Sequence, residues 1–419
     1  ALHSIRSIVM QVIDELYLLR KENGLCSVKE IYHKTLLSPM QIVLVDDRCN
    51  DGSIDAMARS CEQLVTSNKD VSFTVHDHRL DESPVQEDPD TCSPPMISLH
   101  IVHSPRAGIA CALNHGLDYC RADLIVRMDA DDISEPQRLL SQISFMHANP
   151  SIAAVGTSTV LFSTTQTTNG KQDNRCSDII LPYSDQTQKF TTSVLWPSLT
   201  ISDPGFMAWA MLFTCSISHP SILFRKTTIQ ELGGYDESIS RCEDYDLWLR
   251  LLNRDCRSMV CLPFHGLWHR KHSQSSSSIG SATQRDEADE ASYQALGRIF
   301  GSTNNDAGPL VLEQVSTLRN PSSAQSSVLD NAVKLLLRVE SSFLQKNSER
   351  LTQQEIALIK LDCNARIGEM ASLTLKDKTS IDHCDNKSTS FAWKLWCERC
   401  PDKQLERLSL LCHTKVEKT

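Results

Sequence analysis

Three aspartates stand within four positions directly after an apolar run. The run is "LIVRM", and Asp129, Asp131 and Asp132 lie in the "DADD" that follows it. Like charges this close are costly when partly buried, unless a cation offsets them. Carboxylate oxygens suit Mg²⁺ and Mn²⁺, ions that also keep positions for phosphate oxygens. The spacing therefore predicts a divalent metal site, and a solvated acidic turn at a helix N-terminus is the alternative.

The residues after this cluster predict the start of a helix. Ser134 and Gln137 stand three positions apart, with Pro136 between them and the helical pattern "RLLSQISFM" after them. This is the spacing of a capping box with proline near the helix start. We therefore expect the aspartates on a strand-to-helix loop.

Two further acidic pairs could take part in chemistry. Asp46 and Asp47 end the apolar run "QIVLV" and could accept hydrogen bonds from a base or ribose. Glu243 and Asp244 begin a helical pattern, where one carboxylate could orient and the other act as general base. A capped turn and a helix-dipole effect are the respective alternatives, and spacing does not decide between them.

The elements that must position these acids alternate along the chain. "QIVLVDD", "ISLHIVHS" and "ADLIVRM" are strand-like, and each leads through a turn into a helical pattern. Alternating strands and helices predict an α/β fold, a Rossmann-like, mostly parallel sheet flanked by helices. Ligands of such sheets bind outside the carboxyl ends of the strands, which is where the acids lie.

Composition argues against several classes of protein. The chain has 419 residues and a formal net charge of -10, without the Lys/Arg runs of a nucleic-acid or membrane surface. Its 16 cysteines are scattered, which favours reduced core thiols over a disulfide framework. The uncharged stretch from Gly205 to Phe224 is interrupted by His219 and Pro220, so a buried helix followed by a buried strand is favoured over a membrane span.

Composition shifts also suggest how the chain is divided. Residues 1–276 read as one domain with inserted loops at about 67–97 and 163–205. Residues 277–290 are rich in serine and then in acids, as in a linker, and helical spacing from 291 to 419 predicts a C-terminal helical appendage.

Five motifs, taken in order, resemble one known family. They are "VLVDDRCNDGSID", the stretch from "AGIACALNHGLDYC" through "RMDADDISEPQRLL", "HPSILFRKTTIQELGGYDES", "EDYDLWLRL" and "HRKHSQSS". Together they are similar to the inverting, nucleotide-sugar-dependent glycosyltransferases of family 2, with the GT-A fold. A lone Asp-x-Asp is weak support, but five motifs in this order over residues 1–276 are specific.

The resemblance implies a donor site. Asp46 and Asp47 would lie at the base and ribose of a nucleotide, by default uridine diphosphate. Asn114 would face the nucleotide side, Asp129 the ribose or a metal-bound water, and Arg270 would be a cation near the phosphates. The acceptor, a glycan, lipid, protein or RNA, has no readable code.

The resemblance also implies a metal and a base. Asp131, Asp129 and His272 would hold Mn²⁺ or Mg²⁺, with Asp132 as a supporting partner. Asp244 would be the general base with Glu243 beside it, so that an acceptor hydroxyl attacks opposite the leaving diphosphate and inverts the anomeric centre. His219 could approach the acceptor, or it could be a satisfied histidine before a buried strand.

The chain departs from the family pattern at its beginning. Family members start with an apolar strand before a helix resembling "LHSIRSIVMQ", whereas this sequence starts at that helix. We expect a fragment that lacks the first strand, which leaves targeting open. A cytoplasmic location is favoured from this chain, which has no evident membrane segment.

Three other functions are weighed against this one. A haloacid-dehalogenase phosphatase also uses Asp-x-Asp after a strand, but it wants Gly or Thr soon after the second Asp, and "DADDISEP" has neither. A transferase fold kept only for binding or scaffolding is the stronger rival. Cys397 and Cys400 have zinc-ligand spacing, but neighbouring Cys and His pairs complete no familiar finger, so plain thiols are favoured over structural zinc.

Overall fold

The computed structural model describes residues 40–48, 52, 54–56, 59, 72–78, 96–164, 176–179, 188–196, 203–270, 281–301, 310–324, 326–376 and 391–399. They group into two compact units whose sequences are interleaved. The first unit draws on Ala1–Ser202, Ser216–Leu247 and Ser258–Gln284, and the second on Asp203–Cys215, Trp248–Arg257 and Arg285–Thr419.

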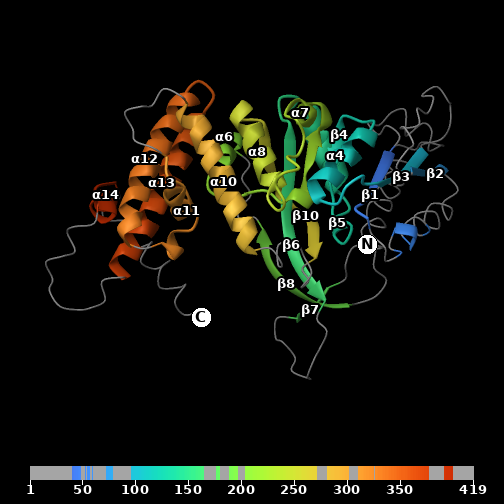
Figure 1. The fold of residues 1–419 in the computed structure, drawn as a ribbon, viewed down its shortest axis with the longest axis horizontal. Coiled ribbons are helices and arrows are strands. Elements are labelled where there is room, and N and C mark those ends of the chain that lie inside the picture. Colours follow the sequence, from blue (N-terminus) through green and yellow to red (C-terminus); the bar gives the residue numbers. More distant parts are fainter. Residues whose placement is uncertain are drawn as a thin grey trace, which may run out of the picture. The chain divides into compact units, whose positions relative to one another are not determined.

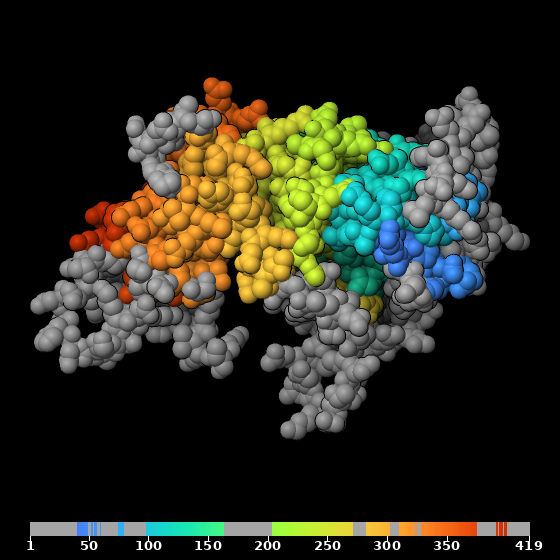
Figure 2. Space-filling model, viewed as in Figure 1, coloured from blue at the N-terminus to red at the C-terminus, as the bar shows by residue number. Residues whose placement is uncertain are grey.

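A wholly parallel sheet carries the first acidic pair. Its strands are β1 (Met40–Asp46), β3 (Met96–His103) and β2 (Ser72–His78), side by side in the order β1-β3-β2. Helix α4 (Ile109–Tyr119) packs on β1 and β3, and the blue β1 surface lies beside the cyan α4 region in Figure 2. A Cβ atom at Gly116 would lie 2.6 Å from Val45 Cγ2, so glycine allows this close approach.

A second, mixed sheet forms the centre of the first unit. Its strands are β4 (Leu124–Val126), β5 (Ile133–Ser134), β6 (Ala154–Thr164), β7 (Cys176–Ile179), β8 (Gln188–Trp196), β9 (Leu223–Arg225) and β10 (Met259–Arg270). The order is β4-β9-β6-β10-β5, with β8 pairing with both β6 and β7. The long strands β6 and β10 run parallel to each other (Figure 1), and the other pairs in this sheet are antiparallel.

Short helices and an apolar core support this second sheet. The helical segments are α5 (Arg138–Ala148), the 3₁₀ turn η1 (His219–Ser221) and α7 (Lys226–Glu231). Met146 of α5 packs with Val155, Leu223 and Val260 from three neighbouring strands. Burial of these side chains fixes α5 against the sheet just after the loop that bears the aspartates.

The second unit is helical. Its helical segments are α6 (Pro204–Met211), most of α8 (Glu243–Arg254), most of α10 (Ser281–Phe300), α11 (Leu312–Arg319), η3 (Pro321–Ser323), α12 (Ser326–Lys346), α13 (Gln353–Lys376) and α14 (Phe391–Arg399). Trp209 of α6 donates from Nε1 to Asp362 Oδ2 at 2.7 Å, and its ring meets Phe343 edge-on at 5.6 Å. Aromatic packing therefore joins α6 to α12 and α13.

The α/β class and the helical C-terminal region are confirmed, and the first sheet is parallel as expected. The stretch from Gly205 to Phe224 is a buried helix and then a buried strand, also as expected. Among the helices of the described residues, none has both the length and the apolarity to cross a membrane.

The expected capping box is wrong. Ser134 lies in β5, where it pairs with Leu267 of β10, and α5 begins only at Arg138 after Gln137. Strand pairing to a segment more than 130 residues away outweighs the local capping preference.

The expected domain limits stay a proposal. The nearest division between the two units falls after Gln284 rather than at 276, and α10 begins at Ser281, inside the expected linker. The expected N-terminal helix, His272 and Cys400 lie outside the described residues.

Candidate active site

The end of β4 presents an ion pair between a largely buried arginine and a half-buried aspartate. Arg127 follows the strand, and its side chain is only 10% exposed, with Nη2 2.6 Å from Asp129 Oδ1. Its backbone N–H donates to Ile222 O at 2.9 Å, which ties this strand end to the segment before β9. The guanidinium therefore offsets one carboxylate charge at the point where the aspartates leave the sheet.

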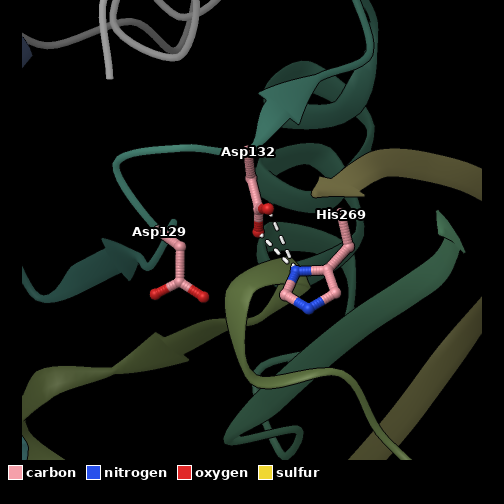
Figure 3. A group of neighbouring side chains, drawn as sticks. All are labelled: Asp129, Asp132 and His269. Atoms are coloured by element: carbon pink, nitrogen blue, oxygen red, sulfur yellow. Dashed lines mark hydrogen bonds and ion pairs between the residues drawn. The ribbon is translucent and has the colours of Figure 1, made fainter. Parts of the chain in front are cut away.

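Asp129, Asp132 and His269 form the group that could hold a metal among the described residues (Figure 3). One ligand atom from each lies within 4.8 Å of the others. His269 Nδ1 lies 3.0 Å from both oxygens of the fully buried Asp132. Burial alone would lower the pKa of His269, but the hydrogen bond with Asp132 and the negative charges of Asp132, Asp129 and Asp131 together raise that pKa. Burial also raises the pKa of Asp132.

Arg270 closes the loop that carries these aspartates. Its backbone N–H donates to Asp132 Oδ1 at 2.9 Å, and its Nε donates to Asp131 O at 3.0 Å. Its guanidinium also lies over the Phe162 ring, 4.7 Å from the centroid. The end of β10 thus holds both backbone and side chain of the aspartate loop. The predicted role of Arg270 near the phosphates of a donor stays a prediction.

The predicted metal ligands are brought together only in part. Asp129 belongs to the group, whereas Asp131 is half-buried and contributes its backbone oxygen to Arg270. Asp132 and His269 are the other two members of the group, and His272 lies outside the described residues. The assignments of Asp131 and His272 to the metal stay predictions.

A buried arginine and glutamine brace the same loop from beneath. Arg138 Nη2 donates to the backbone oxygens of Arg127 and Pro220, both at 2.9 Å, and its Nε donates to Gln142 Oε1 at 3.1 Å. Gln142 Nε2 donates to the backbone oxygens of Val155 and Ser221, both at 2.9 Å. Burial lowers the pKa of Arg138 to about 9. This pair joins β4, β6 and η1 where each reaches the site.

The second acidic pair starts α8. Glu243 is buried, while the Asp244 side chain remains 21% exposed. Asp244 Oδ1 accepts a hydrogen bond from Tyr245 N at 2.7 Å. Burial raises the pKa of Asp244, and the nearby charges of Arg127 and Asp129 oppose each other in their effect on it. Asp244 therefore lies within electrostatic range of the residues at the end of β4.

The Asp46 and Asp47 pair lies at the carboxyl edge of the parallel sheet. Asp46 Oδ2 lies 2.9 Å from His103 Nδ1, whose other nitrogen lies 3.0 Å from Asp77 Oδ1. Burial alone would lower the pKa of His103, but its two carboxylate partners raise it. Asp47 accepts the backbone N–H of Gly108, at 3.1 and 3.3 Å to its two oxygens, just before α4. The expected place at a strand edge holds; nucleotide contact stays a prediction.

Asn114 fastens a loop. Its Oδ1 accepts from Tyr235 N at 2.9 Å, and its Nδ2 donates to Tyr235 O at 2.9 Å and to Glu237 Oε1 at 3.2 Å. Gly234, with a φ of 72°, lets the loop approach, because a Cβ there would lie 2.6 Å from Asn114 Oδ1. The side-chain amide of Asn114 is thus hydrogen-bonded to Tyr235 and Glu237, and its predicted role facing a nucleotide stays a prediction.

The middle of the chain matches a known family. Residues 96–211, which include the aspartate loop, match the family model described as glycosyl transferase family 2. The family 2 match agrees with the GT-A assignment made from the sequence motifs.

Curated relatives of the family 2 region carry glycosyltransferase names. The bifunctional glycosyltransferase pgtA of Dictyostelium discoideum is 26% identical over 341 residues, which cover 76% of this chain and 42% of that protein. An Escherichia coli protein named UDP-Gal:alpha-D-GlcNAc-diphosphoundecaprenol beta-1,3-galactosyltransferase is 29% identical over 152 residues, covering 36% of this chain and 44% of that protein. The chain thus spans less than half the length of these relatives.

Solved structures in the comparison are more distant. The structure of S. aureus TarS 1-349 in complex with UDP-GlcNAc is 12% identical, with a TM-score of 0.40, over 86% of this chain and 91% of that chain.

Several residues of the candidate site were not predicted from the sequence. They are the groups that support the acids rather than the acids themselves: Arg127, Arg138, Gln142, Tyr235 and His269. Arg138 and Gln142 stand four apart on a predicted helix, a spacing that puts both on one face. That signal could have singled them out as a pair, whereas no local pattern relates His269 to Asp132.

Replacing Asn114 with alanine is expected to lower the free energy of unfolding by about 2 kcal/mol, because Tyr235 would lose partners for both backbone groups. Urea denaturation measures this change. Asn149→Ala is the matched control, since it removes one amide hydrogen bond, to Phe145 O, at the end of α5. Equal destabilisation by the two substitutions would contradict the role of Asn114 as a loop fastener.

Proposed function

We propose that this chain is a metal-dependent, inverting glycosyltransferase that moves a sugar from a UDP-linked donor to an acceptor hydroxyl. The observation that carries this proposal is that the Asp244 carboxylate lies within electrostatic range of Asp129. Asp129 is in turn one of the three residues whose carboxylate and imidazole groups could hold a metal ion. The family 2 region and the glycosyltransferase names of its relatives support the reaction class. The name of the Escherichia coli relative specifies UDP-Gal as its sugar donor, which supports uridine diphosphate as the nucleotide.

The donor set fits a divalent cation. Asp129, Asp132 and His269 offer carboxylate oxygens and an imidazole nitrogen, which suit Mn²⁺ or Mg²⁺. A histidine ligand commonly donates its other ring N–H to a carboxylate, as His269 can do to Asp132. When bound, the cation would offset the charge that develops on the departing diphosphate. Asp131 and His272 are proposed as further ligands on the basis of the motif resemblance.

Asp244 would supply the base. Its Oδ1 accepts the backbone N–H of Tyr245, which leaves Oδ2 to take the proton of the acceptor hydroxyl. The hydroxyl oxygen forms its bond to the anomeric carbon as the bond from that carbon to the diphosphate oxygen breaks. The electron pair leaves with the diphosphate, and attack from the opposite face inverts the anomeric centre. Burial favours such a role because it raises the pKa of Asp244.

The remaining predicted residues would bind the donor. Asp46 and Asp47 would contact the base and ribose, and Arg270 would lie at the diphosphate. Asp46 and Asp47 both lie at or just beyond the carboxyl end of β1 in the parallel sheet, the general location of ligands in α/β folds. The acceptor class, whether glycan, lipid, protein or RNA, stays open in this proposal.

UDP release tests the proposal. The chain is incubated with UDP-galactose or UDP-N-acetylglucosamine and Mn²⁺, and free UDP is measured with water as the acceptor. We expect release well above the protein-free rate, abolished by a chelator and restored by excess Mn²⁺. UDP binding without release from any UDP-sugar would instead favour the alternative of a catalytically impaired binding or scaffold protein.

A further inference from the structure

A buried tyrosine and histidine stand behind Asp244. His219 is 7% exposed and Tyr235 2% exposed, and His219 Nε2 lies 2.9 Å from the Tyr235 hydroxyl oxygen. The other ring nitrogen of His219, Nδ1, lies 4.0 Å from Asp244 Oδ2. Tyr235 is itself fixed through its backbone by Asn114. Tyr235, His219 and Asp244 therefore follow one another in series, and Asn114 holds the backbone of the first of them.

The protonation states of His219 and Tyr235 follow from their burial. Burial, and then the positive charge of Arg127, lower the pKa of His219 well below its usual value, so the ring is neutral. Burial raises the pKa of Tyr235, so its hydroxyl keeps its proton. The 4.0 Å contact between His219 and Asp244 is thus the approach of a neutral ring to a carboxylate, with no ion pair.

The position of the single imidazole hydrogen is then decided by its neighbours. A carboxylate can only accept, so a bare Nδ1 lone pair facing Asp244 Oδ2 would be repelled. A hydrogen on Nδ1 is attracted instead, and Nε2 is left to accept from the Tyr235 hydroxyl. The carboxylate therefore selects the tautomer with N–H on Nδ1, and the Tyr235 hydroxyl stabilises it by donating to Nε2.

We propose that His219 is a positioning residue for Asp244: its Nδ1–H, held in place by Tyr235, faces Oδ2 and keeps the carboxylate oriented and ionised. The inference rests on the proposed role of Asp244 as general base. It adds a reason for burying a histidine and a tyrosine at this place, because their hydrogen-bonded dipoles oppose the effect of burial on Asp244.

Other charged groups near Asp244 act in the same region. Arg127 favours its ionised form, Asp129 disfavours it, and Glu243 precedes it on α8. These groups stay unchanged when His219 is substituted, so the experiment compares substitutions at that one position.

Two amide substitutions separate the nitrogens of His219. Asparagine places an N–H near the position of Nδ1, whereas glutamine places one near Nε2. Chains labelled with ¹³Cγ-aspartate are titrated, and the Asp244 resonance is identified by its absence from Asp244→Asn. We expect His219→Gln to raise the midpoint by about half a pH unit to one unit, and His219→Asn to leave it within about 0.3 units. Equal midpoints in the two variants, or the reverse order, would overturn the proposal.

Tyr235→Phe provides a second test that keeps the histidine in place. Without the hydroxyl, Nε2 loses the donor that stabilises this tautomer, so the Asp244 midpoint should rise, but by less than in His219→Gln. Tyr119→Phe, in α4, is the control for loss of a tyrosine hydroxyl and should leave the midpoint unchanged. An unshifted midpoint in Tyr235→Phe would overturn the tautomer argument even if a His219 variant did not fold.

The outcome is distinguishable from failure of the proposed function. The titration needs no turnover, so it tests His219 whether or not UDP is released. If Asp244→Asn releases UDP as fast as the unaltered chain, the proposed function falls while the titration still reports on His219. If both hold, the pH midpoint of UDP release should shift in His219→Gln in the same direction as the Asp244 resonance.

Discussion

Asp244→Asn is expected to slow UDP release from a UDP-sugar by about 10²- to 10⁴-fold, the usual contribution of a general base. The amide keeps the size of the side chain and can still accept from Tyr245 N, so the fold and the affinity for UDP should persist. Initial rates of UDP release at saturating donor measure the change, and calorimetric titration with UDP measures the affinity. A loss of affinity without a loss of rate would assign Asp244 to donor binding instead.

The pH profile gives the same prediction a second reading. A base works as its carboxylate, and burial raises the pKa of Asp244. Activity is therefore lost as the pH falls through that raised pKa, at a higher pH than an exposed aspartate would give. Asp244→Asn should remove this limb from the residual rate. Asp255→Asn is the matched control, because Asp255 lies just beyond the other end of α8 in an exposed pair with Arg350 and should leave rate and profile unchanged.

Asp129→Asn is expected to weaken Mn²⁺ binding by about 10- to 100-fold and to reduce UDP release accordingly. Asp129 is half-buried, so its substitution disturbs packing less than that of the fully buried Asp132. His269→Gln should have a similar effect, because it removes the imidazole ligand. The signal of free Mn²⁺ in electron paramagnetic resonance, measured against protein concentration, reports the affinity without any turnover.

Asp131→Asn distinguishes the two candidate sets of metal ligands. If the cation is held only by Asp129, Asp132 and His269, this substitution should leave the Mn²⁺ affinity within about threefold of its original value. A loss as large as that in Asp129→Asn would instead support the assignment made from the Asp-x-Asp motif. A normal affinity in Asp129→Asn and His269→Gln would exclude the grouped residues as the metal site.

Local patterns predicted much of the first unit. The strand-like runs "QIVLVDD", "ISLHIVHS" and "ADLIVRM" overlap β1, β3 and β4, and α4 follows its turn as expected. Hydrophobic periodicity predicts these elements correctly because each of them buries one face or both faces against elements that are close to it in the sequence. The expectation failed at Ser134, where pairing with a distant strand decided the structure.

The acids of the candidate site were accessible to sequence reasoning, but their supports were not. Asp129, Asp132 and Asp244 stand at element ends, and charge makes them conspicuous there. His269 meets Asp132 across 137 positions, and Arg138 meets Pro220 across 82, so no local period relates them. Such pairings arise only when β10 and η1 fold back onto the aspartate loop. They are set by burial, which requires each enclosed polar group to find a partner.

The interleaving of the two units limits how this protein could be divided or inherited. Asp203–Cys215 and Trp248–Arg257 lie between segments of the first unit in the chain, yet pack within the second. In the second unit Trp209 meets Phe343, and Arg366 stacks on Phe213. A chain shortened to residues 1–276 would keep Trp209 and Phe213 but lose these partners, and would expose apolar surface prone to aggregation. The helices after residue 285 therefore do not form a unit that could be exchanged by itself. Recombination that replaced them would also require matching substitutions in α6 and α8.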